Sequence, residues 1–218
     1  MKIIDLSKED SILNQYVKEI RDKDIQKDPL RFRKNLERIG EIFAYEISKK
    51  LTYKDIDTTT PLGEAETRVL NNKLVLSTIM RAGLPLHQGM MNIFDKAQNA
   101  FVSAYRKHHK DGTFDVKVEY VSSPTLDNKV LIITDPMLAT GHSMILTHRE
   151  MLKKGKPVHV HLVSTVASVQ GIEELKKELP GNDITLWMAA LDHELTAQAY
   201  IVPGLGDAGD LAFGIKED

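Results

Sequence analysis

Five short, mostly apolar segments in the second two-thirds of the chain have the pattern of buried β-strands. They occupy residues 74–80, 100–105, 130–135, 158–166 and 184–190. Between them, apolar residues recur at helical spacing from about residue 86, over 144–154 and over 169–179. Strands that alternate with helices of this length predict an α/β fold with a mostly parallel central sheet flanked by helices.

Two helices are predicted ahead of the first strand, within an N-terminal part that spans residues 1–51. Ser7 is a candidate cap for the first helix, over about residues 12–20. Asp28 followed by Pro29 begins the second, which extends to about residue 51. Its apolar stripe fits either the core or a subunit interface and consists of Phe32, Leu36, Ile39, Phe43 and Ile47.

The second helix is also locally basic, through Arg31, Arg33, Lys34 and Arg38. A solvated charged face is the favoured interpretation of such a cluster. The alternative is a surface that binds an anionic effector, and the pattern alone does not decide between the two.

Two further stretches have weaker patterns. Residues 52–73 are mixed, and residues 58–63 have the composition of a loop. Residues 113–121 alternate, with Phe114, Val116, Val118 and Tyr120 expected on one face. The alternation predicts a half-exposed antiparallel strand, within a flap that we assign to residues 111–126.

Composition narrows the functional classes. The 218 residues carry a formal net charge of -2, which gives no reason to expect a nucleic-acid partner. Cysteine is absent, which excludes disulfides, thiolate metal sites and a cysteine nucleophile. No run approaches the roughly 20 apolar residues of a membrane span, and no targeting segment is evident. We therefore expect a cytoplasmic protein with no membrane partner.

Histidine pairs raise the question of a metal site. His108 and His109 are adjacent, so on an extended strand their side chains point to opposite faces. His159 and His161 share a face, but no third ligand is near them in the sequence. Structural histidines are therefore favoured over metal ligands at both places.

The stretch at residues 130–143 (VLIITDPMLATGHS) has the pattern of an anion site. A buried strand ends at Asp135, a turn of small residues follows, and a helix opens at about residue 144. Backbone N–H groups and the helix dipole together favour a phosphate at such a position. Thr140 or Ser143 as the N-cap of an ordinary core helix is the alternative.

Three other stretches carry candidate chemistry. Arg81 follows the strand at 74–80 and can hold a phosphate or diphosphate, or form a local salt bridge. Arg106 opens a basic cluster after the strand at 100–105. Residues 200–210 (YIVPGLGDAGD) combine glycines, a proline and two aspartates with apolar anchors, which favours an ordered hood at residues 191–215 over a disordered tail.

Taken together, residues 79–83, 105–106, 135–143 and 200–210 closely resemble the uracil phosphoribosyltransferases. The resemblance spans about residues 28–214, in the same order. It implies a type I phosphoribosyltransferase-like fold in one domain over residues 1–218. It also implies transfer of the 5-phosphoribosyl group from 5-phosphoribosyl-1-diphosphate (PRPP) to N1 of uracil, which gives UMP and diphosphate.

The resemblance also implies roles for individual residues. Arg81 and Arg106 would bind PRPP, Asp135 would hold the ribose hydroxyls, and Asp207 would contact PRPP or its magnesium ion. Arg81, Asp135 and Asp207 are the catalytic candidates. The remaining PRPP-binding candidates are Pro136, Met137, Leu138, Ala139, Thr140, Gly141, His142 and Ser143, and the uracil-binding candidates are Ile201, Gly206, Asp207 and Ala208.

Cofactor and partners follow from the same resemblance: Mg²⁺, the substrates uracil and PRPP, a GTP effector, and a homodimer or homotetramer. Two departures from the family pattern concern Lys107–His109, where Asn-Glu-Glu is common, and the flap at 111–126. A non-catalytic sensor of PRPP or nucleotides on the same fold is one alternative. A phosphoribosyltransferase for another base is the second, and the tail at 200–210 favours uracil over both.

Overall fold

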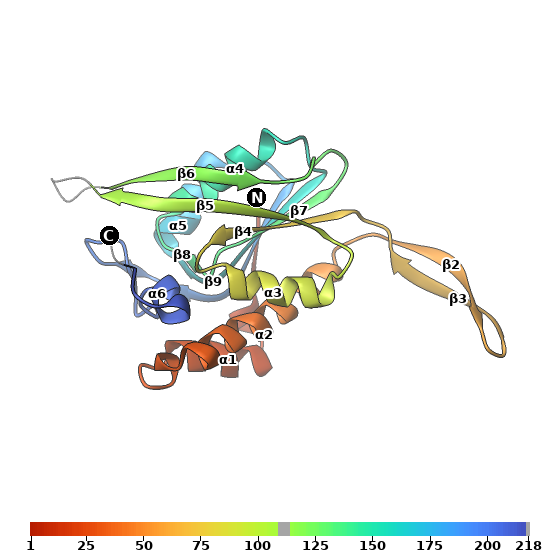
Figure 1. Ribbon diagram of the computed structural model, residues 1–218, viewed down its shortest axis with the longest axis horizontal. Coiled ribbons are helices and arrows are strands. Elements are labelled where there is room, and N and C mark those ends of the chain that lie inside the picture. Colours follow the sequence, from red (N-terminus) through yellow and green to blue (C-terminus); the bar gives the residue numbers. More distant parts are fainter. Residues whose placement is uncertain (109–113, 217–218) are drawn as a thin grey trace.

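The computed structural model describes residues 1–108 and 114–216; for residues 104–108 and 114–117 it describes the backbone alone. A central sheet runs in the order β1-β10-β9-β7-β4-β5-β6 (Figure 1). Its neighbouring strands are parallel except for β5 and β6, which are antiparallel. The predicted α/β fold with a mostly parallel sheet is therefore confirmed.

The five strands predicted from apolar segments are all present. They are β4 (Leu74–Met80), β5 (Gln98–His108), β7 (Val130–Thr134), β9 (His159–Ser168) and β10 (Ile184–Asp192). Alternate residues of β4, β7, β9 and β10 face two separate clusters: Leu74 and Leu76 point to one side of β4, and Val75 to the other. Each of these four strands is thus covered on both faces, which explains why its sequence shows few polar positions.

Helices cover the two faces unequally, as Figure 1 shows. One face carries α1 (Ile12–Arg21), α2 (Pro29–Ser48) and α3 (Leu84–Ile93), and the other carries α4 (His142–Leu152) and α5 (Val169–Glu178). The five stripe residues of α2 are at most 1% exposed and belong to the first cluster. The stripe is therefore core, and the alternative of a subunit interface is wrong for these residues.

Helix α1 begins later than its first candidate cap. Ser11 is the N-cap, and its hydroxyl accepts from the backbone N–H of Leu13 at 3.3 Å. Ser7 lies instead in a 3-10 turn, η1 (Leu6–Lys8), where its hydroxyl bonds Asp5 at 2.6 Å. The prediction was wrong because both serines suit a cap and the apolar spacing did not distinguish them.

Two glycines let α2 and α3 pack with their backbones in direct contact. A Cβ at Gly40 would lie 2.2 Å from the carbonyl oxygen of Leu86, and one at Gly89 would lie 1.9 Å from that of Glu37. Neither position has room for any side chain, because the opposing atoms are backbone. The absence of two side chains therefore fixes the separation of these helices.

Two elements have no counterpart in the predictions. Strand β1 (Lys2–Asp5) pairs with β10 at the sheet edge. The hairpin of β2 (Tyr53–Thr60) and β3 (Gly63–Leu70) projects from the body (Figure 1). The loop expected at residues 58–63 is therefore wrong in part, because residues 58–60 continue β2 and Thr58 bonds Thr67 across the hairpin at 2.6 Å.

The expected antiparallel strand of the flap is β6 (Phe114–Ser122), which pairs with β5. The pairing shifts register between Ser103 and Ala104. Val118 and Val121 both pack toward the core, whereas Tyr120 is 56% exposed. The prediction that Val118 and Tyr120 share a face is thus wrong, because an irregularity in a strand breaks the two-residue period.

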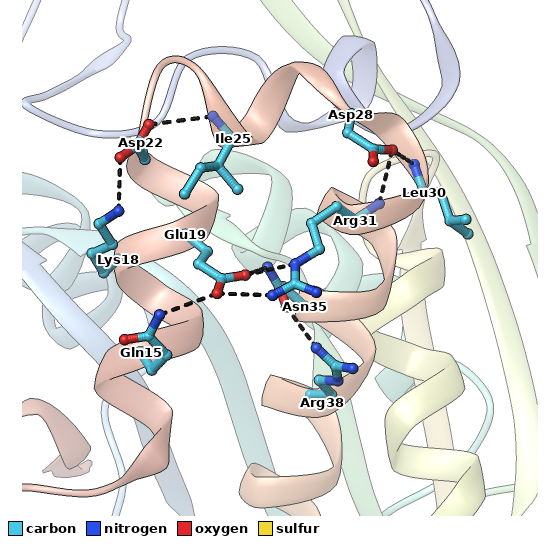
Figure 2. A network of polar contacts seen from close by, with 10 residues as sticks. All are labelled: Gln15, Lys18, Glu19, Asp22, Ile25, Asp28, Leu30, Arg31, Asn35 and Arg38. Carbon is cyan, nitrogen blue, oxygen red and sulfur yellow. Dashed lines mark hydrogen bonds and ion pairs between the residues drawn. The ribbon is translucent and has the colours of Figure 1, made fainter.

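The four cations of α2 are engaged by the protein itself. Arg31 donates two hydrogen bonds to Glu19 of α1 at 2.8 and 2.9 Å (Figure 2), and Arg33 donates to the carbonyl of Ala212 at 2.6 Å. Lys34 pairs with Glu37 at 2.7 Å, and Arg38 donates to Asn35 at 3.2 Å. Two of them therefore tie α2 to other elements and are not a free solvated face.

Candidate functional site

The anion-site stretch lies at the carboxyl end of β7 and continues along β9. Asp135 follows β7, and its Oδ1 accepts from the N–H of Met137 at 3.4 Å. The carbonyl of Pro136 accepts from the N–H groups of Thr165 and Val166 at 3.1 and 2.9 Å. Met137 and Leu138 then form a short strand, β8 (Met137–Leu138), that pairs with β9. Residues 136–138 thus anchor the loop to the sheet.

The loop ends where α4 begins, at Gly141. This residue is the N-cap, with φ +83° and no side-chain cap bond. Thr140 contacts the His142 ring instead, with Oγ1 2.9 Å from Nδ1. The alternative of a helix capped by Thr140 or Ser143 is therefore wrong, and the first N–H groups of α4 have no side-chain cap. A helix end of this kind suits an anion.

Two residues outside the motif hold this loop from behind. The hydroxyl of Ser168 donates to the carbonyl of Ala139 at 2.5 Å and accepts from the N–H of Gly171 at 2.8 Å. A Cβ at Gly171 would lie 2.5 Å from that same carbonyl. One signal was visible in the sequence, since Ser168 stands at the N-cap position of α5, but no sequence pattern linked that cap to residue 139.

Arg81 leaves the carboxyl end of β4, next to β7. The Met80–Arg81 peptide bond is cis. Nη2 pairs with Oδ1 of Asp210 at 2.9 Å, and Nη1 donates to the carbonyl of Gly214 at 3.3 Å. The salt bridge is therefore not local, because it joins residues 129 positions apart. The side chain of Arg81, which is 41% exposed, lies between the sheet edge and the C-terminal segment.

Arg106 lies on β5, opposite Val116 of β6. Its side chain is outside the described part of the chain, as are the side chains of Lys107 and His108. His109 and part of the flap at 111–126 lie outside it as well. The PRPP-binding role of Arg106 and the departures at 107–109 therefore stay predictions.

The C-terminal stretch folds over the same edge of the sheet. The short strands β11 (Glu194–Leu195) and β12 (Ile201–Val202) pair, and helix α6 (Ala208–Phe213) follows. Asp207 caps α6, because its Oδ1 accepts from the N–H of Asp210 at 3.0 Å. Gly204 and Gly206 have φ +55° and +93°, so the loop before α6 uses conformations that favour glycine.

Buried apolar residues join this segment to the core, although three of the expected anchors, Tyr200, Phe213 and Ile215, are exposed. Ile201, Leu205, Ala208 and Ala212 are each at most 4% exposed and join the cluster under α1, α2 and α3. Residue 206 is exposed beside them, and residue 207 is partly buried. The four uracil-binding candidates therefore sit on one anchored segment, which the Arg81–Asp210 ion pair joins to the carboxyl end of β4.

The paired histidines of β9 have structural partners. His161 is buried, and its Nδ1 accepts from the indole Nε1 of Trp187 at 3.1 Å, while His159 bonds Thr185 at 2.9 Å. Among the described residues, no group of three or more potential ligands gathers around a metal position. Burial lowers the pKa of His161 to about 3, and the neighbouring His159 adds to the effect.

This burial makes folding stability depend on pH. In the unfolded chain each histidine takes up a proton near pH 6.5. His161 stays neutral in the folded protein, and so does His87, because burial lowers the pKa of His87 to about 4. Stability is therefore complete above pH 6.5 and falls below it. We expect about 2 kcal/mol to be lost per buried histidine between pH 7 and 5.

His161→Asn tests this directly, because asparagine keeps an acceptor for Trp187 and does not titrate. Urea unfolding at pH 7 and 5 should show a smaller loss for this variant than for wild type. His193→Asn is the matched control at an exposed position. Equal losses in the two variants would mean that burial of His161 does not cause the pH dependence.

Comparisons with known proteins agree with this geometry. The family model for uracil phosphoribosyltransferase matches residues 7–215. A uracil phosphoribosyltransferase of Porphyromonas gingivalis is 54% identical over 99% of this chain and 100% of its own, and one of Methanococcus vannielii is 36% identical over 88% and 82%. The structure of the AQ2163 protein from Aquifex aeolicus superposes with a TM-score of 0.86 at 27% identity, covering 98% of both chains.

Proposed function

The chain belongs to the uracil phosphoribosyltransferase family, and we propose that it transfers the 5-phosphoribosyl group from PRPP to N1 of uracil, giving UMP and diphosphate. One observation carries this for the chain itself. The ion pair between Arg81 and Asp210, at 2.9 Å, brings the carboxyl end of β4 to the anchored segment at 191–215. The strand ends that suit PRPP and the segment that suits a base thereby form one site.

Incubation with labelled uracil, PRPP and Mg²⁺ tests the proposal, with UMP as the measured product. Hypoxanthine, adenine, orotate and cytosine are the controls for base selectivity. The expected result is UMP from uracil and no nucleotide from any of the four other bases. If the protein bound PRPP and formed no nucleotide from any base, the proposal of an enzyme would be wrong. The alternative of a non-catalytic sensor of PRPP or nucleotides would then be favoured.

On the PRPP side, we assign the 5-phosphate to the backbone N–H groups of residues 139–143 at the start of α4. Asp135, at the end of β7, would hold the ribose hydroxyls and favour positive charge on the ribose as the anomeric bond breaks. Arg81 would stabilise the negative charge that develops on the leaving diphosphate. Since its guanidinium is paired with Asp210, binding of diphosphate requires an exchange of partners.

On the uracil side, we assign recognition to backbone groups of Ile201 and of residues 206–208. Gly206 is exposed and has no neighbouring side chain closer than Leu211, at 4.0 Å from a hypothetical Cβ. A flat base can therefore approach the backbone there. The segment would hold N1 of uracil in line with the anomeric carbon, so that positioning supplies much of the rate.

Mg²⁺ fits the donor set that this site offers. Asp135 and Asp207 supply carboxylates, and Mg²⁺ in phosphate-transfer sites commonly combines one or two carboxylates with phosphate oxygens of the substrate. We propose that the ion binds mainly through PRPP, with Asp207 as its protein contact. When bound, it would neutralise charge on the diphosphate.

Asp207 is also the candidate proton acceptor from uracil, and Asp207→Asn separates this role from its structural one. Asparagine caps a helix as well as aspartate does, so α6 should persist. If the carboxylate accepts the proton, we expect kcat to fall at least tenfold at saturating substrates. A near-normal kcat would exclude the role, and unchanged circular dichroism would show that α6 is intact.

The β2–β3 hairpin supports a homodimer or homotetramer, because both strands project from the body and Leu62 at its tip is fully exposed. Sedimentation of wild type and of a chain lacking residues 54–69 would test its part in assembly. Activation by GTP stays a prediction, and the internal partners of Arg31 and Arg33 argue against α2 as its site.

No helix among the described residues is long and apolar enough to cross a bilayer. A cytoplasmic location stays a prediction from the sequence. The division into an N-terminal part, a flap at 111–126 and a uracil-binding hood at 191–215 is proposed on the same basis.

A further inference from the structure

A pair of charged side chains joins the end of α1 to the loop that precedes the proposed uracil contacts. Arg21, the last residue of α1, donates from Nη1 and Nη2 to the two carboxylate oxygens of Asp192 at 2.8 and 3.0 Å. Asp192 Oδ2 also accepts from the N–H of Gly204 at 2.9 Å, and Arg21 Nη1 donates to the carbonyl of Gly204 at 3.3 Å. Both backbone polar groups of Gly204 are thus held by this pair.

The pair is largely removed from water. The side chain of Asp192 is 7% exposed, and that of Arg21 is 21% exposed. A carboxylate buried to this extent needs its cation, because an unpaired charge in the interior is costly. Gly204 has little freedom of its own, since φ is +55° and a Cβ would lie 2.1 Å from the carbonyl oxygen of Ile201.

The next residue of the loop is held from the same side. In the amide orientation that satisfies both of its polar atoms, Gln26 donates to the carbonyls of Leu205 and Ile20 at 2.9 and 2.8 Å. Gln26 lies in the 3-10 turn η2 (Ile25–Lys27) between α1 and α2. Two consecutive loop residues, 204 and 205, therefore depend on the N-terminal helices for their backbone partners.

The corner that carries Arg21 and Gln26 is itself braced. Asp22 accepts from Lys18 Nζ at 2.8 Å and from the N–H groups of Asp24 and Ile25 at 3.0 and 3.2 Å. Figure 2 shows the contacts of Asp22 with Lys18 and Ile25, beside the Glu19–Arg31 pair that joins α1 to α2. A corner fixed in this way can transmit its position to residues 204 and 205.

We propose that Arg21 is a positioning residue for the base: through Asp192 and Gly204 it fixes the backbone that presents Gly206, Asp207 and Ala208 to uracil. The inference rests on the proposed function for the identity of the base. It gives the N-terminal helices a part in base recognition, although they carry none of the residues assigned to either substrate.

Kinetics of Arg21→Met test the inference. We expect KM for uracil to rise about tenfold, which corresponds to about 1.4 kcal/mol, whereas KM for PRPP and kcat stay close to wild type. Arg21→Lys, which can make one of the two bonds, should give an intermediate KM. Arg21 lines an open cavity of about 480 Å³, so added guanidinium ion should lower KM for uracil in the methionine variant.

Lys49→Met is the matched control, because it removes a cation from an exposed pair, with Glu46, at the far end of α2 and outside the corner. It should leave both KM values unchanged. An Arg21→Met enzyme with a wild-type KM for uracil, or with equal rises in both KM values, would overturn the inference. Thermal unfolding of each variant shows whether it is folded under the assay conditions.

Hydrogen exchange provides a readout that does not need catalysis. Amides of residues 204–207 should exchange faster in Arg21→Met than in wild type or Lys49→Met, because Gly204 loses the support of its partner. If exchange is faster in Arg21→Met but the wild-type protein makes no UMP, the support of the loop by Arg21 would stand and the proposed function would be refuted. Unchanged exchange and unchanged KM in an active enzyme would refute the positioning role and retain the function.

Discussion

Arg81→Gln should lower kcat/KM about 10³-fold, the largest effect that we expect from a single substitution. Glutamine keeps a polar side chain of similar length but cannot carry the positive charge that the leaving diphosphate requires. The Arg81–Asp210 pair is 41% and 27% exposed, so its loss should cost little stability. Steady-state rates of UMP formation, with each substrate varied in turn, measure the effect.

Arg149→Gln is the matched control. Arg149 also forms an ion pair across two elements, with Glu178 at 2.6 Å, and its side chain is 52% exposed. It lies on α4 outside the proposed site, so activity should be unchanged. Losses of similar size in the two variants would show that the effect at Arg81 is not specific to the diphosphate.

Gly171→Ala should lower kcat/KM for PRPP about 10²-fold, although residue 171 belongs to none of the motifs. Its Cβ would lie 2.5 Å from the carbonyl oxygen of Ala139 and 2.9 Å from that of Leu138. Since both atoms are backbone, the loop must move, and a displacement of about 1 Å from productive geometry costs about this factor. We expect the change chiefly in KM for PRPP.

Helix propensity separates this effect from a loss of folding. Alanine is favoured over glycine in a helix by about 1 kcal/mol, so α5 itself should not weaken. Gln170→Ala, at the exposed neighbouring position, is the control and should keep the wild-type KM. If Gly171→Ala bound PRPP with the wild-type KM, the prediction would be wrong. The loop would then accommodate the added Cβ without losing its PRPP-binding geometry.

The sequence predicted the parts of the fold whose side chains are periodic. The core strands and the stripe of α2 were predictable because their buried positions are apolar, at a spacing that matches a strand or a helix. The hairpin at 53–70 has no such apolar pattern, because its exposed strands bury no apolar face. Strand β1 is only four residues long, and its place is set by pairing with residues 185–188 rather than by its own pattern.

The same division holds for the site. Asp135, Arg81 and the tail at 200–210 were proposed from the sequence because each stands in a contiguous motif. Ser168, Gly171 and Arg21 were missed because each acts on a residue remote in sequence, at distances that only the fold establishes. The N-cap position of Ser168 and the helix-terminal position of Arg21 were visible, but neither indicates which loop it would hold.

The crossing of α2 and α3 has a mechanical consequence for the site. Helix α3 begins directly after the turn that carries Arg81, and α2 carries Arg33, which holds the carbonyl of Ala212 in α6. The helices touch at Gly40 and Gly89, so a methyl group added at either position would clash with the backbone of the opposite helix. The clash would displace α3 relative to α2. The interior therefore sets the distance between Arg81, the proposed cation for diphosphate, and the segment proposed to bind the base. Residues far from either proposed contact can be under selection to preserve this distance.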